Sequence, residues 1–324
     1  MMNQDSKSPI QKPLVPPKAR ISAAMDDYHG HQISDPYRWL EDAAAAERQH
    51  FVEAENAYTQ SVLEDIPGRD ELRRRIERLL TIGRVGAPRI RGDRYFYERR
   101  DGRQNQAVVY VREGQEADGR AGSTVPGKIP DEDRALIDVN PLASDGTIAL
   151  DWWYPSDDGR YVAFGTSANG SELSTLQIID VTSGTLLPEK IAYTRAASVA
   201  WLPDSSGIYY TRYPNPDDVP AGEEMYNRRV FFHGLNQGKN FQGLHDALIF
   251  PSEGESMDPQ HWPNVSLSND GRWLLVDVSK GWTRTDLYLK DLSIKDKAAT
   301  ASKFQTITVG ENCLYHAEIL DGQL

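Results

Sequence analysis

SDDGRYVAF, at residues 156–164, recurs as SNDGRWLLV at residues 268–276. Weaker copies read RGDRYFY at 91–97 and DSSGIYY at 204–210, and DGQL at 321–324 repeats the beginning of the pattern. The glycines of successive copies lie 48 to 67 residues apart. Similarity at such a period is typical of a repeat array rather than of one compact domain. The last copy stops after its turn, so the pattern predicts a fifth unit that is not completed within the chain.

Each copy predicts a tight turn followed by a strand, because such a turn requires positive φ, which glycine adopts without a Cβ clash. A second apolar segment predicts a further strand in four units, at residues 108–111, 176–181, 229–233 and 286–292. The alternation at Tyr95 and Tyr97 predicts half-buried antiparallel strands. Four strands per unit, repeated radially, indicate a β-propeller. One large β-sandwich is the alternative, but it predicts no period near 57 residues.

The fold class is therefore mainly β, with a partial propeller of about four to five blades behind a helical segment. Residues 1–34 are polar and rich in proline, and we expect an extended leader. Residues 35–84 are predicted to be helical, since Asp35-Pro36 offers an N-cap and a first-turn proline. Pro67-Gly68 is expected to separate two helices, and the arginines of the second are interpreted as a solvated face. Residues 85–324 are assigned to the truncated propeller.

Composition narrows the class of partner. The formal net charge of -12 argues against nucleic acids and anionic membranes, both of which require a basic protein surface. The chain has one cysteine, Cys313, so no intramolecular disulfide is expected and a reducing, cytoplasmic location fits best. We find neither an apolar signal segment at the N-terminus nor a run of about 18 apolar residues that would predict a membrane span.

Ser167 is the nearest candidate for a catalytic nucleophile, in the stretch GTSANG at residues 165–170. This stretch is one residue too long for G-x-S-x-G, and a nucleophile elbow needs a strand-to-helix turn with an oxyanion hole. Because Ser167 is expected between two strands, we interpret the stretch as a polar loop. No catalytic residue is expected in the chain.

No metal, nucleotide or other cofactor is expected. The pair His29-x-His31 has metal-ligand chemistry, but without a third ligand nearby a surface or capping role is the better interpretation. The sequence has no glycine-rich phosphate loop. Seven tryptophans suggest either a stacking platform for carbohydrate or packing between sheets, and the place of Trp273 directly after a turn favours packing.

Several motifs resemble the prolyl oligopeptidase family. DYHG at residues 27–30 and DPYRWLED at 35–42 are similar to its N-terminal signature. DGRQNQ at 101–106, NPLASDGTIAL at 140–150 and TRYP at 211–214 continue the resemblance in the same order. The oligopeptidase B group shares the Tyr-x-Trp-Leu core, but the Gln-Asn-Gln stretch fits the prolyl branch better.

The resemblance implies a seven-bladed propeller that caps an α/β-hydrolase domain and gates the entry of short peptides, which are cleaved after proline. It also implies that the Ser, Asp and His of the triad lie outside this chain. The expected partners are thus the missing hydrolase domain and short proline-containing peptides. A stand-alone propeller that binds peptides or proteins without catalysis is the alternative. The family often has Lys-Phe-Ser where this chain has Arg195-Ala196-Ala197, so we expect an aromatic contact to the peptide to be lost.

Overall fold

The chain divides into two compact units, one up to Thr81 and one from Ile82 onwards. The structure is a computed structural model, and it describes residues 15–114, 133–235, 242–243, 245–252, 254–293 and 303–319. Among these residues, no helix is both long enough and apolar enough to cross a membrane.

The first unit begins with a two-stranded antiparallel hairpin, β1 (Met25–Tyr28) and β2 (His31–Ser34), which the sequence analysis did not predict. Its turn places His29 and Gly30 at φ +56° and +85°. The carboxylate of Asp27 accepts the main-chain N–H of Gly30 at 2.7 Å, which stabilises the reversal. Short polar segments of this kind give a weak strand signal, because three of the four residues in β1 and all four in β2 are exposed.

Helical structure follows in three pieces: η1 (Arg38–Leu40), α1 (Ala46–Glu64) and α2 (Arg69–Leu80). The prediction that the long helix begins at Asp35-Pro36 is wrong. The chain there makes one 3-10 turn, and Ala45, in an extended conformation, is the N-cap of α1. The predicted break is confirmed, since Gly68 is left-handed and separates α1 from α2.

Trp39 is the packing centre at the start of α1. Its ring meets that of Phe51 edge-on at 5.6 Å, and its indole N–H donates to the carbonyl of Arg20 at 2.8 Å. By contrast, the apolar residues Leu72 and Leu79 of α2 are 59% and 60% exposed. The helical unit therefore keeps an exposed apolar stripe beside its arginines.

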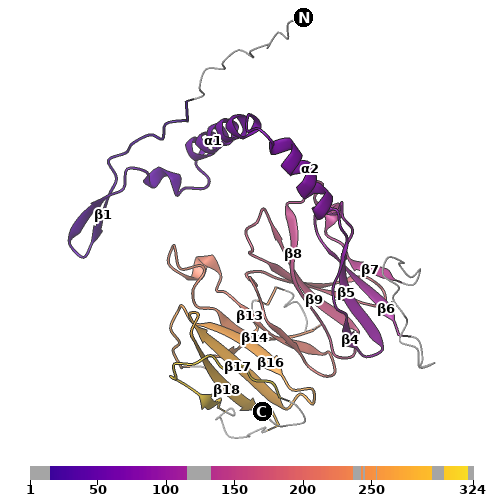
Figure 1. The fold of residues 1–324 in the computed structure, drawn as a ribbon. Helices are drawn as coiled ribbons and strands as arrows, with labels where there is room; N and C mark the ends of the chain where they lie inside the picture. Colours follow the sequence, from indigo (N-terminus) through magenta and orange to yellow (C-terminus); the bar gives the residue numbers. More distant parts are fainter. Residues whose placement is uncertain are drawn as a thin grey trace, which may run out of the picture. The chain divides into compact units, whose positions relative to one another are not determined.

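The second unit consists of antiparallel sheets in which consecutive strands are neighbours, except that the two short strands at the start of the first sheet both pair with its third strand (Figure 1). The first sheet contains β3 (Arg84–Val85), β4 (Arg89–Arg91), β5 (Arg94–Arg100), β6 (Val108–Glu113) and β7 (Arg134–Ile137). The second contains β8 (Ile148–Pro155), β9 (Tyr161–Ala168), β10 (Thr175–Asp180) and β11 (Leu186–Ile191). Short 3-10 turns, η2 (Asn140–Leu142) and η3 (Pro216–Asp218), lie in the loops.

The third sheet contains β12 (Val199–Trp201), β13 (Gly207–Arg212), β14 (Arg229–Gly234) and β15 (Ala247–Phe250). The fourth contains β16 (Trp262–Leu267), β17 (Trp273–Lys280), β18 (Arg284–Asp291) and β19 (Gln305–Thr308). The described residues thus form four blades of a β-propeller, and the second apolar segments of the sequence are the third strands, β6, β10, β14 and β18. Residues 321–324, where a fifth unit is expected, lie outside the described residues.

Three buried clusters lie between neighbouring sheets. Phe96 of the first sheet packs with Val162 and Phe164 of the second. Further clusters join the second sheet to the third and the third to the fourth. Alternate residues of one strand enter different clusters, so Val162 belongs to the first cluster and Ala163 to the second.

The alternation predicted at Tyr95 and Tyr97 does not extend to the inner strands of the second and third sheets. The first five residues of both β9 and β13 are buried. A sheet that is covered by a neighbour on each face buries both sets of side chains, and its strands then read as continuous apolar runs. Phe96 and Tyr97 of β5 in the first sheet are also both buried, at 0% and 7% exposure, but by different partners. Phe96 enters the cluster shared with the second sheet, whereas the ring of Tyr97 stacks on Tyr110 of its own sheet at 6.0 Å.

The repeated turn is built on one aspartate. In the second sheet, Asp158 Oδ1 accepts the hydroxyl of Ser156 at 2.6 Å and the main-chain N–H of Arg160 at 2.9 Å. Asp270 accepts the equivalent groups in the fourth sheet at 2.6 and 3.0 Å. Such hydrogen bonds from an aspartate side chain mimic those of a main-chain turn and stabilise the reversal of the chain. The glycine after each aspartate is left-handed, at φ +70° for Gly159 and +71° for Gly271.

The third sheet departs from this pattern. Its left-handed residue is Ser205, at φ +56°, whereas Gly207 lies at the start of β13 without positive φ. A Cβ at Gly207 would meet the carbonyl oxygen of His233 and the ring of Phe232, each at 2.8 Å. Gly207 is thus required for close packing between strands, and the expectation that it shapes the turn is wrong.

Candidate functional site

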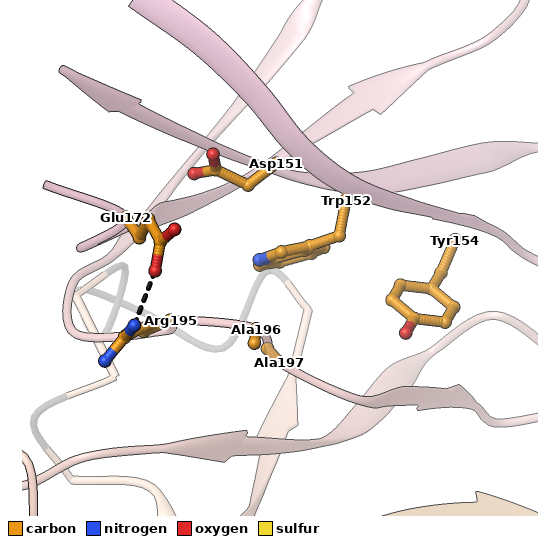
Figure 2. Close-up of a pocket in the computed structure, with 7 residues that line it drawn as sticks. All are labelled: Asp151, Trp152, Tyr154, Glu172, Arg195, Ala196 and Ala197. Carbon is orange, nitrogen blue, oxygen red and sulfur yellow. Dashed lines mark hydrogen bonds and ion pairs between the residues drawn. The ribbon is translucent and has the colours of Figure 1, made fainter. Parts of the chain in front are cut away.

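A hollow of about 430 Å³ lies beside β8 of the second sheet. Its lining comes from β8, the β9–β10 turn and the loop before β12: Asp151, Trp152, Tyr154, Glu172, Arg195, Ala196 and Ala197. Figure 2 shows the Trp152 ring above Ala196 and Ala197, with Glu172 and Arg195 on one side and Tyr154 on the other. The hollow therefore combines aromatic faces with charged groups at its rim.

Trp152 is placed by a bulge and by a glycine. The β8–β9 register shifts between Leu150 and Trp152, so Asp151 is the extra residue and Trp152 lies opposite Gly165. A Cβ at Gly165 would meet the indole at 2.3 Å, so glycine makes room for the ring. The indole N–H donates to the carbonyl of Thr194 at 3.1 Å, which fixes the ring against the loop before β12.

The carboxylate of Asp151 is held by two hydroxyls from neighbouring strands. Ser167 donates to Asp151 Oδ1 at 3.0 Å, and Ser174 donates to Oδ2 at 2.6 Å. No cationic side chain of the described residues lies within 4 Å of this carboxylate. Asp151 is therefore a fixed negative group at the rim of the hollow.

Glu172 and Arg195 form the other polar edge. The guanidinium Nε donates to Glu172 Oε2 at 3.1 Å, and the side chains are 64% and 36% exposed. Exposed pairs of this kind contribute little to stability, typically 0–1 kcal/mol. Glu172 and Ala196 both have positive φ, at +57° and +45°. Left-handed backbone at non-glycine residues is uncommon and gathers at functional sites.

Ser167 is not placed as a nucleophile. It lies within β9 rather than in the predicted polar loop, its side chain is 6% exposed, and its hydroxyl is engaged by Asp151. Only Asn169-Gly170 of the stretch forms the turn, with φ +55° and +67°. The strand is longer than the sequence indicated because Ala149 and Ile148 of β8 pair with Ser167 and Ala168.

The histidines do not gather into a site. His29 and His31 are exposed at the β1–β2 turn, and the described residues contain no group of three potential metal ligands. His233 is buried at 2% exposure, with Nδ1 at 2.9 Å from Asp246 Oδ1. Tyr210 donates to the other oxygen of Asp246 at 2.7 Å, so this buried cluster ties β13 and β14 to the residues before β15.

The tryptophans have different roles. Trp153 and Trp201 belong to the inter-sheet clusters, as the packing interpretation predicts. Trp273 is half-buried beneath the guanidinium of Arg272 at 4.5 Å, so packing between sheets does not describe this residue. Trp282 is 95% exposed in the β17–β18 turn. These side chains are dispersed and form no continuous stacking platform.

Residues 195–197 could be singled out from the sequence, but the rest of the hollow could not. An aromatic contact was expected to be lost there, yet Trp152 and Tyr154 bring two rings to the same hollow, 5.9 Å apart. The adjacent pair Trp152-Trp153 was the available signal. One member faces the core and the other the hollow, as expected for neighbours on a strand.

Comparison with known proteins gives the family. Residues 16–322 match the family described as prolyl oligopeptidase, N-terminal beta-propeller domain. The chain belongs to this family, and it is the propeller portion of a prolyl oligopeptidase-type protein.

Named relatives agree with this assignment. The chain is 28% identical over 280 residues to the prolyl endopeptidase of Elizabethkingia meningoseptica, covering 86% of this chain and 36% of that protein. It is 27% identical to prolyl oligopeptidase A of Galerina marginata, covering 85% and 39%. The chain thus spans well under half the length of these relatives.

Solved structures show the same fold. A prolyl endopeptidase from a study of two such enzymes aligns with a TM-score of 0.73 and 29% identity, over 91% of this chain and 40% of that one. Prolyl oligopeptidase B from Galerina marginata, bound to a 35mer substrate, aligns with a TM-score of 0.67 and 21% identity, over 90% and 41%. At 21% identity, the match to prolyl oligopeptidase B is evidence for the fold alone.

Proposed function

We propose that this propeller works with an α/β-hydrolase domain outside residues 1–324, in a serine peptidase that cleaves short peptides after proline. The observation that carries the proposal is the family match over residues 16–322, together with relatives named prolyl endopeptidase. In this proposal the propeller gates access of the peptide to the hydrolase. The chain supplies no nucleophile of its own among the described residues.

We propose that the hollow contacts the peptide away from the scissile bond. Trp152 and Tyr154 offer aromatic faces to an apolar or proline side chain. Asp151 and the Glu172–Arg195 pair offer polar groups that fix orientation, which is the usual composition of a small-ligand site. We further propose a cytoplasmic location, since the single cysteine suits a reducing compartment.

The test is to express the complete reading frame that contains codons 1–324 and to measure cleavage of a short peptide ending in a proline anilide. The matched substrate carries alanine in place of proline. We expect cleavage of the proline substrate, with a strong preference over the alanine one. The variant Trp152→Ala should raise KM more than it lowers kcat if the hollow binds the peptide.

A different outcome would favour the stand-alone module. If the frame encodes no hydrolase and the protein binds proline-containing peptides without cleaving them, the propeller is a binding domain and the peptidase proposal is wrong.

A further inference from the structure

Arg228 is a fully buried cation behind the hollow. It directly precedes β14 and is 1% exposed. Burial, which disfavours the charged form, lowers the pKa of its guanidinium to about 10, so the group is still charged at neutral pH. No carboxylate of the described residues lies within 4 Å of it. The negative charge of Asp277 favours the charged form from a greater distance, and hydrogen bonds hold the guanidinium in place.

Those contacts lead to the residues that line the hollow. Nη2 donates to the carbonyl oxygen of Ala196 at 2.9 Å, and Nη1 lies 3.4 Å from that of Arg195. Nη2 also donates to Thr211 Oγ1 at 2.7 Å, and the guanidinium lies 4.2 Å from the centre of the Trp262 ring. The cation is thus anchored in the third and fourth sheets while it holds two main-chain carbonyls of the loop before β12.

The carbonyl that receives the shorter bond belongs to a strained residue. Ala196 has φ +45°, a left-handed conformation in which the Cβ of an alanine is strained against the following carbonyl oxygen. Its side chain lines the hollow beneath Trp152, as Figure 2 shows. The conformation persists only where surrounding groups impose it.

We propose that Arg228 is a positioning residue whose guanidinium holds the carbonyls of Arg195 and Ala196 inward, which keeps Ala196 left-handed and the hollow open beside Trp152. The inference concerns the shape of the hollow and stands whether or not the protein is a peptidase.

The first test uses Ala196→Gly, because glycine tolerates positive φ. In the parent chain, Ala196→Gly should raise Tm by about 2–4 °C, since the strain is relieved. In an Arg228→Met background, which keeps the apolar stem over Trp262, the loop no longer has to be left-handed. There Ala196→Gly should give no gain in Tm. An equal gain in both backgrounds, or no gain in the parent, would overturn the proposal.

The second test reads the hollow directly. Acrylamide quenching of Trp152 is obtained by subtracting the matched Trp152→Phe chain. Arg228→Met should change the quenching constant of Trp152 at least twofold, whereas Arg228→Lys, which keeps the charge on a single donor nitrogen, should restore part of the parent value. Unchanged quenching in a folded Arg228→Met chain would overturn the proposal.

Arg212→Met is the matched control. Arg212 lies in the same sheet, stacks on Phe231 at 4.3 Å and donates to Gly243 rather than to the loop before β12. It should lower Tm without changing the quenching of Trp152. If Arg228→Met does not fold, the Arg228→Lys background decides: the gain from Ala196→Gly should be smaller there than in the parent, and an undiminished gain would refute the role of the guanidinium.

Discussion

Gly92 and Gly159 belong to turns of adjacent sheets, and each lies against the backbone of the other's turn. A Cβ on Gly92 would meet the carbonyl oxygen of Asp158 at 2.8 Å, and one on Gly159 would meet that of Arg91 at 2.7 Å. Gly271 repeats the relationship further along, where a Cβ would lie 2.8 Å from the ring of Pro203. At these three positions the repeated glycine therefore has two functions, since it permits the left-handed turn and it lets neighbouring blades approach.

We expect Gly159→Val and Gly271→Val each to lower the free energy of unfolding by about 1–3 kcal/mol, because a β-branched residue is strained at positive φ. Chemical denaturation of each variant measures the loss. Gly170→Val is the matched control, with φ +67° and no neighbour within 4 Å of a Cβ. Gly170→Val should lose less free energy of unfolding, because it introduces the same backbone strain without a clash against a neighbouring turn. Variants at 159 and 271 that unfold together with the parent chain would contradict the turn assignment.

Asp158→Ala should destabilise the chain more than Asp270→Ala. Both aspartates stabilise their own turns, but Asp158 Oδ1 also accepts the hydroxyl of Ser205 from the next sheet at 2.8 Å. A hydrogen bond to a charged group contributes about 1.5–3 kcal/mol, so we expect a difference of about that size. Urea unfolding of both variants and of Ser205→Ala gives the comparison. Equal losses for the two aspartates would show that the bond between sheets is not stabilising.

The Lys280–Asp286 pair predicts an acid-dependent loss of stability in the fourth sheet. Burial by itself raises the pKa of Asp286, but hydrogen bonds from the Lys280 ammonium, at 2.5 Å, and the Gly310 N–H bring that pKa below its ordinary value. A lowered folded-state pKa gives stability that is present above the unfolded value, about 4, and is lost as pH falls through the folded value.

Lys280→Met should therefore lower Tm at pH 7, and the gap to the parent should shrink as the pH is lowered to 2. Thermal unfolding across this range measures it. Lys290→Met serves as the control, because Lys290 lies over the Phe304 ring rather than beside a carboxylate. A gap that stays constant from pH 7 to pH 2 would argue against the pair.

The 324-residue chain on its own should hydrolyse neither peptides nor esters, since Ser167 is buried and hydrogen-bonded to Asp151 with no base placed beside it among the described residues. A proline-anilide assay and a serine-directed fluorophosphonate probe test this expectation. Ser167→Ala is the control for the probe. Labelling that disappears in Ser167→Ala would identify a nucleophile that the geometry does not support.

The repeat made the blades predictable. A turn of the type Ser-x-Asp-Gly has a local chemical cause, the aspartate side chain, so Ser156 and Ser268 could be matched from the sequence alone. Gly207 could not be assigned correctly, because its role depends on Phe232, a partner 25 residues away on the neighbouring strand. The start of α1 was also misjudged, since Asp35 and Pro36 satisfy local helix rules while the chain makes only one turn there.

The hollow was less predictable than the fold. Arg195, Ala196 and Ala197 were noticed through a family resemblance, whereas Asp151 is at the rim because of a bulge in β8 that no local pattern announces. Trp152 depends on Gly165 across the strand pair. A site built from a bulge, a turn and a distant loop depends on how the strands are paired. That register is fixed only when the whole sheet forms, so it cannot be read from a short stretch of sequence.

Each inner strand is divided between two clusters, so adjacent residues of one strand depend on different neighbouring sheets for their packing. Val162 shares a cluster with Phe96 and Val109 of the first sheet, and Ala163 shares one with Ile208 of the third. A change in side-chain volume at Val162 would therefore disturb packing against the first sheet, whereas one at Ala163 would disturb packing against the third. Two adjacent positions of one strand are thus constrained by different blades.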